Sequence, residues 1–561
     1  MRSAPTWVRA ALGAAASAAL LGLAARVEAP FHWLSFIAFA PWLISVDRAP
    51  ARARLGSAVL LAVLFTAAAF GWLPGTISAY SGASGPVAWA VTLVLAPLVL
   101  QPQIVAAAAA RGLASRWTTQ SRYPRFTTGA AFALGYVGAE WLLPKLFSDT
   151  LGYSFHSSAV LRQAADLAGG RGLTLACVVV SECAAAVVLV AIRREPAGNG
   201  WTNRWRAAAP PALGAAVVIG ALLSYGALRL RQIEARTAAA PRFTAGVVQA
   251  NIARYDKLAA ERGTFDAVKQ ILDAHLALSK ELLEEGPPPD LLVWPETVYP
   301  TTFGAPKSQE GAAFDAQIAA LVARAGVPLI FGAFEQGDRG EHNAAFFLSK
   351  GERGVGYDAY RKSQLFPLTE SVPAWLDGPR FRSWFPWAGH WQAGPGAQAV
   401  SITVANGTAV SFAPLICYEA VYPAYVAEAA RAGAQVLLTI SNDTWFPDVR
   451  GPRLHLISAA FRSLETRLPQ IRATNSGISA LILPSGEIVS PTGFDARAAL
   501  RLAVPRLGAS GTLFTRWGDW LGGVSLGLAA LLLASAKALQ KGRERVRSAG
   551  PRPPSGRSSR R

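Results

Sequence analysis

The sequence predicts a polytopic α-helical membrane domain joined to one large soluble α/β domain. The first observation is length, because 561 residues exceed one ordinary domain and favour two or more units. The second is composition: apolar residues make up 52% of the chain and charged residues only 16%, against about 25% in a typical soluble protein. The third is distribution, because residues 1–230 are dominated by Ala, Leu and Val, whereas residues 242–505 have the mixed composition of a globular domain.

Apolar runs of bilayer length define the membrane domain. A helix that crosses a bilayer needs about 20 mainly apolar residues, and we expect helices 1–7 within residues 1–230 and an eighth after the soluble domain. The first run resembles a signal peptide, but seven further runs favour a retained helix. The expected spans are residues 8–25, 31–46, 55–73, 86–110, 127–147, 172–192, 209–230 and 519–536.

Basic residues at the ends of these runs predict the orientation of the chain. The positive-inside rule places segments rich in Arg and Lys in the cytoplasm, and such segments alternate with loops of low charge such as residues 75–85. A cytoplasmic N-terminus then places residues 231–518 outside the cytoplasm. The basic tail, residues 541–561, is nearly free of apolar residues and is expected to be cytoplasmic and disordered. The cytoplasmic side is defined by Arg2, Arg9, Arg48, Arg52, Arg54, Arg111, Arg116, Arg122, Arg125, Arg193, Arg194, Arg204, Arg206 and Lys541.

Charge and cysteine content exclude several classes of protein. The net charge is +19, but the basic residues lie at the ends of apolar runs, which indicates membrane topology and no nucleic-acid binding. Three cysteines do not make a disulfide framework, and only Cys417 lies in the soluble domain. Glu140 and Glu182 fall within predicted spans, where a carboxylate is costly. A functional and a structural role are both open for each of these two residues.

Strands and helices alternate in the soluble domain, which favours an α/β or layered α+β fold. Helices are expected at residues 265–285 and 314–326, where apolar residues recur at helical spacing. No Gly-rich phosphate loop follows any of the strands, so a nucleotide cofactor is not expected. The expected strands are residues 244–252, 291–296, 328–334, 409–416, 434–441 and 479–486.

Three chemically capable residues in this domain are Glu296, Lys362 and Cys417, of which the first and last stand at strand ends. A thiol is a nucleophile only as the thiolate, which a nearby base or ammonium favours. A carboxylate can take the thiol proton and later activate an amine or water, and a fixed lysine can stabilise an oxyanion. Together the three suffice for thioester chemistry without histidine. Taken singly, each residue also has a structural interpretation: Glu296 as a surface strand end, Lys362 as a solvated charge, and Cys417 as a core thiol.

The sequence around these residues resembles the nitrilase superfamily, whose Glu–Lys–Cys triad lies on an α-β-β-α sandwich. The matching pieces are WPE at 294–296, YRK at 360–362 and ICYE at 416–419. More specifically, the chain resembles the bacterial apolipoprotein N-acyltransferases, which have eight transmembrane helices and one nitrilase-like domain inserted before the last. Further matches are VQANI (248–252), SNDTWF (441–446), RSLETRLPQIRATNSGISALI (462–482), AEW (139–141), LGYS (151–154) and LRQAADLAGGRGLTL (161–175).

The resemblance implies a role for each matched residue. Cys417 would be the nucleophile, Glu296 the general base, and Lys362 the partner that stabilises the oxyanion. No metal or cofactor is implied. The supporting positions of the family correspond to Glu370, Tyr418 and Glu419.

The resemblance also implies the reaction, the partners and the location. The thiolate would attack the sn-1 ester of a phospholipid, commonly phosphatidylethanolamine, and form an S-acyl enzyme and a lysophospholipid. The free α-amine of the diacylglyceryl-cysteine of an apolipoprotein would then take the acyl group, which is the last step of lipoprotein maturation. We expect a monomer in the bacterial inner membrane, with the catalytic domain, residues 242–505, on the periplasmic side.

Three departures from the family pattern concern the surroundings of the triad. Leu368 and Thr369 replace a Phe-Gly pair, Pro447 stands where glycine is common, and Leu258 stands where tryptophan is common. They leave the triad intact. They affect the expected details of acyl-chain and lipid binding and allow a divergent paralogue.

An aromatic segment, residues 373–394, independently indicates substrates from a membrane. Aromatic side chains gather at the membrane–water boundary, where one end is apolar and the other wet. We expect a mobile loop that dips into the outer leaflet and gates lipid entry through Trp384 and Trp387; the alternative is that these rings pack beneath the domain. The aromatic residues of the segment are Trp375, Phe381, Trp384, Phe385, Trp387 and Trp391.

Two other functions compete with the acyltransferase. The first is a membrane-anchored nitrilase-type amidohydrolase that acts on a small amide or nitrile, for which eight spans and an aromatic loop would be superfluous. The second is a non-catalytic membrane scaffold or lipid-binding protein, which would have no use for an intact Glu–Lys–Cys set.

Overall fold

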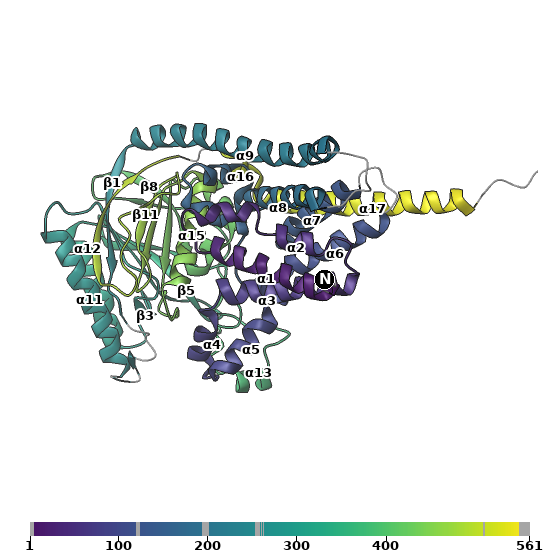
Figure 1. Cartoon of the computed structure of the whole chain (residues 1–561). Coiled ribbons are helices and arrows are strands. Elements are labelled where there is room, and N and C mark those ends of the chain that lie inside the picture. The colour runs from purple at the N-terminus through teal and green to yellow at the C-terminus, as the bar shows by residue number, and fades with distance from the viewer. Residues whose placement is uncertain are drawn as a thin grey trace, which may run out of the picture.

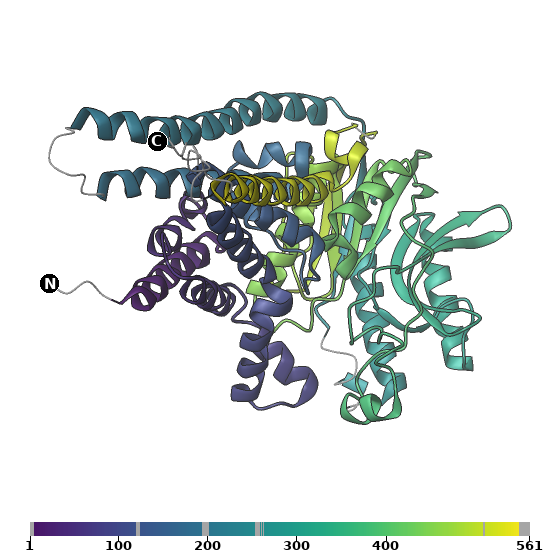
Figure 2. The same ribbon diagram turned by 90° about the vertical axis from the view of Figure 1, so that its right-hand side faces the viewer.

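The computed structural model describes residues 5–118, 124–192, 201–252, 258–259, 261, 263–508 and 511–548. The molecule has two parts, a helical part and a part built on two β-sheets (Figure 1). Helix α9 (Trp201–Ala238) leads from the helical part to the first strand, and α17 (Trp520–Ser548) runs back away from the sheets in the opposite direction, with its axis roughly parallel to that of α9. Figure 2 shows α9 along the upper edge of the molecule and the sheets at the opposite end from the tip of the helical part.

Five helices among the described residues are long and apolar enough to cross a bilayer, and a sixth span results if two helices that meet at a 53° bend are counted as one. The expected number of eight is therefore not confirmed. Residues 31–46 form two short helices with Pro41 in the first turn of the second. The helices of this part are α1 (Thr6–Ala24), η1 (Phe31–Phe36), α2 (Ala40–Ser45), α3 (Ala51–Ala69), α4 (Leu73–Ser81), α5 (Gly85–Leu95), η2 (Ala96–Leu100), α6 (Pro102–Trp117), α7 (Pro124–Leu142), η3 (Leu151–Ser157), η4 (Leu161–Ala164), α8 (Ala165–Ile192), α9 and α17.

The end of α17 differs from the expectation of a disordered tail that starts at residue 541. The helix continues to Ser548, and Gln540 donates a hydrogen bond to Glu544 one turn later at 2.9 Å. Gln, Lys, Arg and Glu are good helix formers, so a run with few apolar residues can extend a helix that is already nucleated. Residues 549–561 lie outside the described residues, as do Arg2, Arg122, Arg193 and Arg194.

Two sheets form the second part. The first has seven strands in the order β13-β1-β2-β4-β5-β6, with β3 paired to β4, and the second has six in the order β12-β11-β10-β9-β8-β7. Strands were expected at six places, and each contains one, although β2 and β11 are shorter than expected. The strands are β1 (Arg242–Gln249), β2 (Leu291–Val293), β3 (Tyr299–Thr302), β4 (Leu329–Gln336), β5 (Glu341–Gly351), β6 (Gly354–Arg361), β7 (Val400–Thr403), β8 (Ala409–Ile416), β9 (Val436–Ser441), β10 (Gln470–Thr474), β11 (Ala480–Ile482), β12 (Ile488–Val489) and β13 (Ala498–Pro505).

The sheets stack face to face, and helices cover both outer faces. Apolar residues of both sheets, such as Val247, Ile330, Phe412 and Ile471, form one buried cluster between them. A second cluster joins the first sheet to α11 (Thr264–Glu284) and α12 (Gln309–Ala325), and a third joins the second sheet to α14 (Pro423–Arg431) and α15 (Arg450–Thr466). The result is the α-β-β-α sandwich that the resemblance implied.

Helix α15 attaches this sandwich to the helical part, because it contacts both the second sheet's covering layer and α8. Arg467, at its end, is fully buried and donates to Gln163 Oε1 at 2.6 Å and to Asp166 Oδ2 at 3.1 Å. Gln163 and Asp166 both lie in the LRQAADLAGGRGLTL motif (161–175) that was matched to the family in the sequence. The two parts are thus joined by buried charged hydrogen bonds, which are among the stronger kind.

Candidate active site

Glu296 follows the short strand β2 and is 5% exposed. Its Oε1 accepts a hydrogen bond from Asn343 Nδ2 at 2.8 Å, and its Oε2 accepts one from the Asn442 backbone N–H at 2.9 Å. The neighbouring strand supplies Gly332, where a Cβ atom would lie 2.6 Å from the Glu296 Cα, so only glycine lets the two strands' ends approach. Neither asparagine was identified as a site residue from the sequence; Asn442 lies in the matched SNDTWF motif, whereas nothing in the pattern marks Asn343.

Lys362 comes directly after β6 and is 1% exposed. Its Nζ lies 3.2 Å from Glu296 Oε1 and 2.6 Å from Glu370 Oε1, so the structure brings these three predicted residues together. Burial by itself lowers the pKa of Lys362, but the two carboxylates outweigh it and raise the pKa above its usual value. Lys362 is therefore a charged ammonium that is held in place by two carboxylates.

Cys417 follows β8 and begins the short helix η5 (Cys417–Val421) with φ at 50°, in the left-handed region. Such a conformation costs a non-glycine residue about 1–3 kcal/mol and is common at functional sites. Burial raises the pKa of the Cys417 thiol well above its usual value, Glu296 raises it further, and Lys362 opposes the shift. The resting residue is thus a neutral thiol that needs a base to become a nucleophile.

Glu419 is fully buried and connects the Lys362 loop to the Cys417 turn. Its Oε1 accepts from the Ser363 and Gln364 backbone N–H groups at 2.7 and 3.2 Å, and its Oε2 accepts from the Ile416 N–H at 2.7 Å. Burial raises the pKa of Glu419, and these N–H groups lower it in part. Glu419 therefore holds the Lys362 loop and the Cys417 turn in position relative to each other.

A buried network that was not predicted lies behind Cys417. One ring nitrogen of His455 is 3.1 Å from the Cys417 carbonyl oxygen, and the other is 3.2 Å from Asp443 Oδ1. Arg472 donates to Asp443 Oδ2 at 2.9 Å. Burial raises the pKa of Asp443, but Arg472 and His455 outweigh it and hold the pKa at about 2. Asp443 and Arg472 were both within matched motifs, so those motifs are the signal that could have identified the network.

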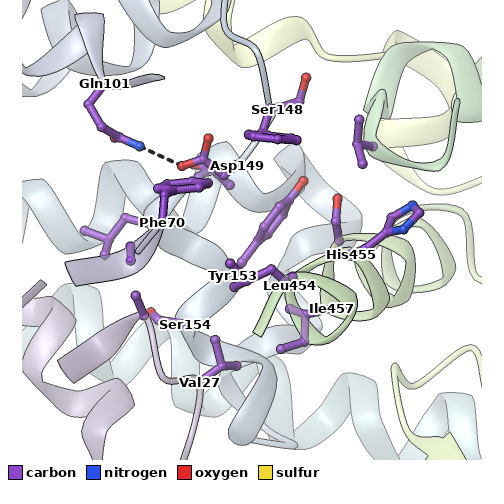
Figure 3. A pocket seen from close by; sticks show the side chains of 18 of the residues that line it. Val27, Phe70, Gln101, Ser148, Asp149, Tyr153, Ser154, Leu454, His455 and Ile457 are labelled. Atoms are coloured by element: carbon purple, nitrogen blue, oxygen red, sulfur yellow. Dashed lines mark hydrogen bonds between the residues drawn. The ribbon is translucent and has the colours of Figure 1, made fainter. Parts of the chain in front are cut away.

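Cys417 and Tyr418 line a pocket that extends from the sandwich into the helical part (Figure 3). The Tyr418 hydroxyl donates to the Leu146 carbonyl oxygen at 2.5 Å, so the residue after the thiol is tied to the helical part. Most of the pocket wall is apolar, and His455 borders it near Cys417. Side chains from the helical part that line the pocket include Leu21, Val27, Phe65, Phe70, Trp72, Phe147 and Tyr153.

The aromatic segment 373–394 lies apart from this pocket. Trp384 ends the short helix α13 (Pro379–Trp384) and is 75% exposed, whereas Trp387 is partly buried and packs against Phe385. Neither Trp384 nor Trp387 lines the pocket. In Figure 1, α13 is drawn at the lower edge of the molecule, below α5.

The three departures from the family pattern occupy different surroundings. Leu368 has φ at 69°, and its N–H donates to the Ser371 carbonyl oxygen at 2.9 Å, which closes a turn next to Glu370. Pro447 packs on α4, where a Cβ atom at Gly75 would lie 3.1 Å from the proline Cγ. Leu258 is buried in the cluster under α11.

Comparisons with known proteins match both parts of the chain. Residues 244–505 match the carbon-nitrogen hydrolase family, and residues 17–183 match the apolipoprotein N-acyltransferase N-terminal domain. The apolipoprotein N-acyltransferase of Azotobacter vinelandii is 32% identical over 93% of this chain and 94% of its own length. That of Bdellovibrio bacteriovorus is 29% identical over 49% of this chain, which spans about half (51%) of that relative. A solved amidase of the nitrilase superfamily from Nesterenkonia AN1 is 18% identical and covers 50% of this chain and 95% of its own, with a TM-score of 0.34, a likeness too low to carry an argument.

Proposed function

The chain belongs to the apolipoprotein N-acyltransferase family, and we propose that it transfers an acyl chain from a phospholipid, through a thioester on Cys417, to the N-terminal amine of a diacylated apolipoprotein. The observation that carries this proposal is the pocket of Cys417, which continues between apolar side chains of the membrane-facing helices. A hydrolase of small amides has no use for such a pocket, and a scaffold has no use for a strained, partly buried thiol beside a Lys–Glu pair.

In the proposed first step, Glu296 accepts the Cys417 proton and the sulfur attacks the sn-1 ester carbonyl of the donor. Lys362 stabilises the oxyanion that develops on the carbonyl oxygen, because its ammonium is already held beside the reacting groups. The carbon–oxygen bond then breaks, Glu296 returns the proton to the glycerol oxygen, and a lysophospholipid leaves. Because the thiol is neutral at rest, the base is needed before attack.

In the second step, the α-amine of the acceptor attacks the thioester carbonyl. Glu296 accepts the amine proton, the carbon–sulfur bond breaks, and Cys417 recovers its proton. Glu370 keeps Lys362 in place through their 2.6 Å contact, and Glu419 keeps the two loops together. The proposed donor is phosphatidylethanolamine, and the proposed unit is a monomer.

We further propose eight spans, with the sandwich on the periplasmic side of a bacterial inner membrane. Residues 31–46, the bent pair and α7 would add three spans to the five long apolar helices. In support of the orientation, α9 begins with Arg204 and Arg206 at the end away from the sheets, and α17 carries Lys541 and Arg543 to that same end (Figure 1).

The aromatic segment is proposed to gate lipid entry at the outer leaflet. Trp375 and Trp384 are 85% and 75% exposed, which suits rings that contact a bilayer rather than a core. Replacing Trp384 and Trp387 with Ser should slow turnover of liposome substrate and spare a donor that is dissolved in detergent. Unchanged turnover with liposomes would contradict the gate.

A labelled donor tests the central proposal. The purified chain is incubated with phosphatidylethanolamine that carries a labelled sn-1 chain, and the protein is examined for a label that hydroxylamine removes. Wild type and a Cys183→Ser control, which changes a thiol in a membrane helix, should both be labelled. No label on the wild type, or the same hydroxylamine-sensitive label on Cys417→Ser, would refute the thioester.

A further inference from the structure

A groove separate from the Cys417 pocket opens between α17, α7 and the end of α6. It has a volume of about 590 Å³, and no described residue lines both the groove and the Cys417 pocket. The groove follows α17 from Leu528 to Glu544, and α17 runs away from the sheets (Figure 1). It therefore lies toward the end of the helical part that is remote from the thiol.

Two glycines explain where the groove begins. A Cβ atom at Gly138 of α7 would lie 2.8 Å from the Leu526 Cα of α17. One at Gly522 would overlap the Trp141 side chain. Small residues let two membrane helices approach this closely, and both contacts lie on the sheet side of the groove. Beyond them the lining positions of α17 recur at three- and four-residue spacing, so one face of this helix is left open toward α7.

Along α17 the groove has the length of one leaflet of a bilayer. Residues 528–544 of a helix rise by about 24 Å at 1.5 Å per residue. Half of a bilayer, with its headgroups, is about 20–22 Å thick. A single phospholipid that lies along α17 would therefore fill the groove from the middle of the bilayer to its surface.

The wall of the groove changes from apolar to cationic along that length. Leu528 and Leu531 line its inner part and are 48% and 66% exposed, so they offer an apolar surface to acyl chains. Arg543 lines its outer end. The Lys537 ammonium lies 5.6 Å from the centre of the Trp117 ring, which also lines the groove. Tryptophan and basic side chains are typical of the level of the headgroups.

The segments at the outer end carry an excess of positive charge. The sequence of residues 112–127, which joins α6 to α7, contains arginine but no Asp or Glu. Basic clusters next to a membrane span attract anionic lipids, and in the proposed topology this end faces the negatively charged cytoplasmic leaflet. The outer part of α17 has five basic residues and one acidic residue, which are Lys537, Lys541, Arg543, Arg545, Arg547 and Glu544.

We propose that this groove binds one anionic phospholipid of the cytoplasmic leaflet. Its acyl chains lie along the leucines of α17 and α7, and its phosphate lies at the level of Lys537 and Arg543. A zwitterionic phospholipid has the same chains but no net charge, so it binds less tightly. The bound lipid is no substrate, because the groove is separate from the Cys417 pocket; it fills the space between α7 and α17 and stabilises the packing of α17, the helix that follows the sandwich.

Native mass spectrometry of the full chain in detergent tests the proposal. The chain is titrated with phosphatidylglycerol and with phosphatidylcholine of the same chain length. Both lipids are ether-linked, so no acyl group can be transferred to Cys417, and the result does not depend on the proposed reaction. The chain should retain phosphatidylglycerol at least about tenfold more tightly, and added salt should weaken that retention because exposed charges are screened. Equal retention of the two lipids would overturn the proposal.

Charge variants locate the retained lipid. Lys537→Gln combined with Arg543→Gln changes two exposed side chains, and retention of phosphatidylglycerol should fall by about 25-fold, because each Lys or Arg near the phosphate contributes about fivefold. Arg204→Gln combined with Arg206→Gln is the matched control, because it removes the same charge from the same end of the molecule, on α9 and outside the groove. This control should retain the lipid. An equal loss in both double variants would contradict the site and indicate a general attraction to a cationic surface.

A second pair of variants tests the space for the acyl chains. Ser535 lines the groove, and Ser535→Phe places a ring in it, whereas Ala534→Phe places the same ring at a neighbouring position that does not line it. Phosphatidylglycerol should raise the melting temperature of wild type and of Ala534→Phe, because a ligand of the folded state stabilises it. Ser535→Phe should lose that rise. The same rise in all three proteins would mean that the lipid lies outside the groove and would overturn the proposal.

Discussion

Glu419 is expected to be indispensable to the stability of the catalytic turn. Its carboxylate accepts from three backbone N–H groups, those of Ile416, Ser363 and Gln364, and from the Tyr360 hydroxyl. The hydroxyl keeps a second contact with another tyrosine, so Glu419→Ala leaves the buried Ile416 N–H and two partly buried N–H groups without an acceptor. At about 1–3 kcal/mol for the buried N–H group, and less for the two partly buried groups that water can reach, the free energy of unfolding should fall by at least about 1 kcal/mol. Burial raises the pKa of Glu419, so the loss of a buried charge offsets part of this cost.

The measurement is chemical denaturation of the purified chain in detergent, followed by tryptophan fluorescence, together with the rate of thioester formation on Cys417. Glu428→Ala is the matched control, because Glu428 is an exposed carboxylate on the next helix, and its loss should change stability by no more than about 0.5 kcal/mol. Glu419→Ala that unfolds like Glu428→Ala would refute the argument from unpaired N–H groups. Normal stability with lost activity would instead place Glu419 in the chemistry.

Three further predictions concern the same domain. Lys362→Met should lower the rate of thioester formation by about 100- to 1,000-fold, because the oxyanion loses its positively charged partner; a loss below tenfold would contradict that role. Iodoacetamide should modify Cys417 slowly at pH 8 and faster as pH rises, because the pKa of this partly buried thiol is raised, and mass spectrometry that finds rapid modification at pH 7 would contradict it. Burial raises the pKa of Glu465 from 4.5 to about 7, with Arg462 and a backbone N–H opposing the shift, so the folded state holds the proton more tightly than the unfolded state. Stability should therefore fall as pH rises from about 4.5 to 7, by up to ~3 kcal/mol, and Glu465→Gln should flatten that fall in denaturation curves.

Much of the fold was predictable from local sequence patterns. The strand that leads to Cys417 was expected at residues 409–416 and is observed as Ala409–Ile416, because a short apolar run bounded by turn residues has few other conformations in a core. Helix α11 was expected at 265–285 and spans Thr264–Glu284, because its apolar residues recur on one face. The number of spans was less predictable, since residues 31–46 have the composition of a span but fold as two short helices.

The candidate site was predictable only where a motif marked it. Glu296, Lys362 and Cys417 each stood in a recognisable context, and their catalytic roles remain predictions. Asn343 and His455 were missed, because a lone polar residue carries no sign of the carboxylate or carbonyl that it will contact.

The sequence by itself determined the division into a membrane part and a sandwich, because apolar length and strand–helix alternation are properties of contiguous residues. The tertiary structure alone decided that Lys362 lies 3.2 Å from Glu296, although 66 positions separate them along the chain. It also decided that Gln103, Glu140 and Asp149 meet at one end of the Cys417 pocket. Such meetings depend on how strands and helices pack over long distances in the chain, and no local pattern of residue types specifies that packing.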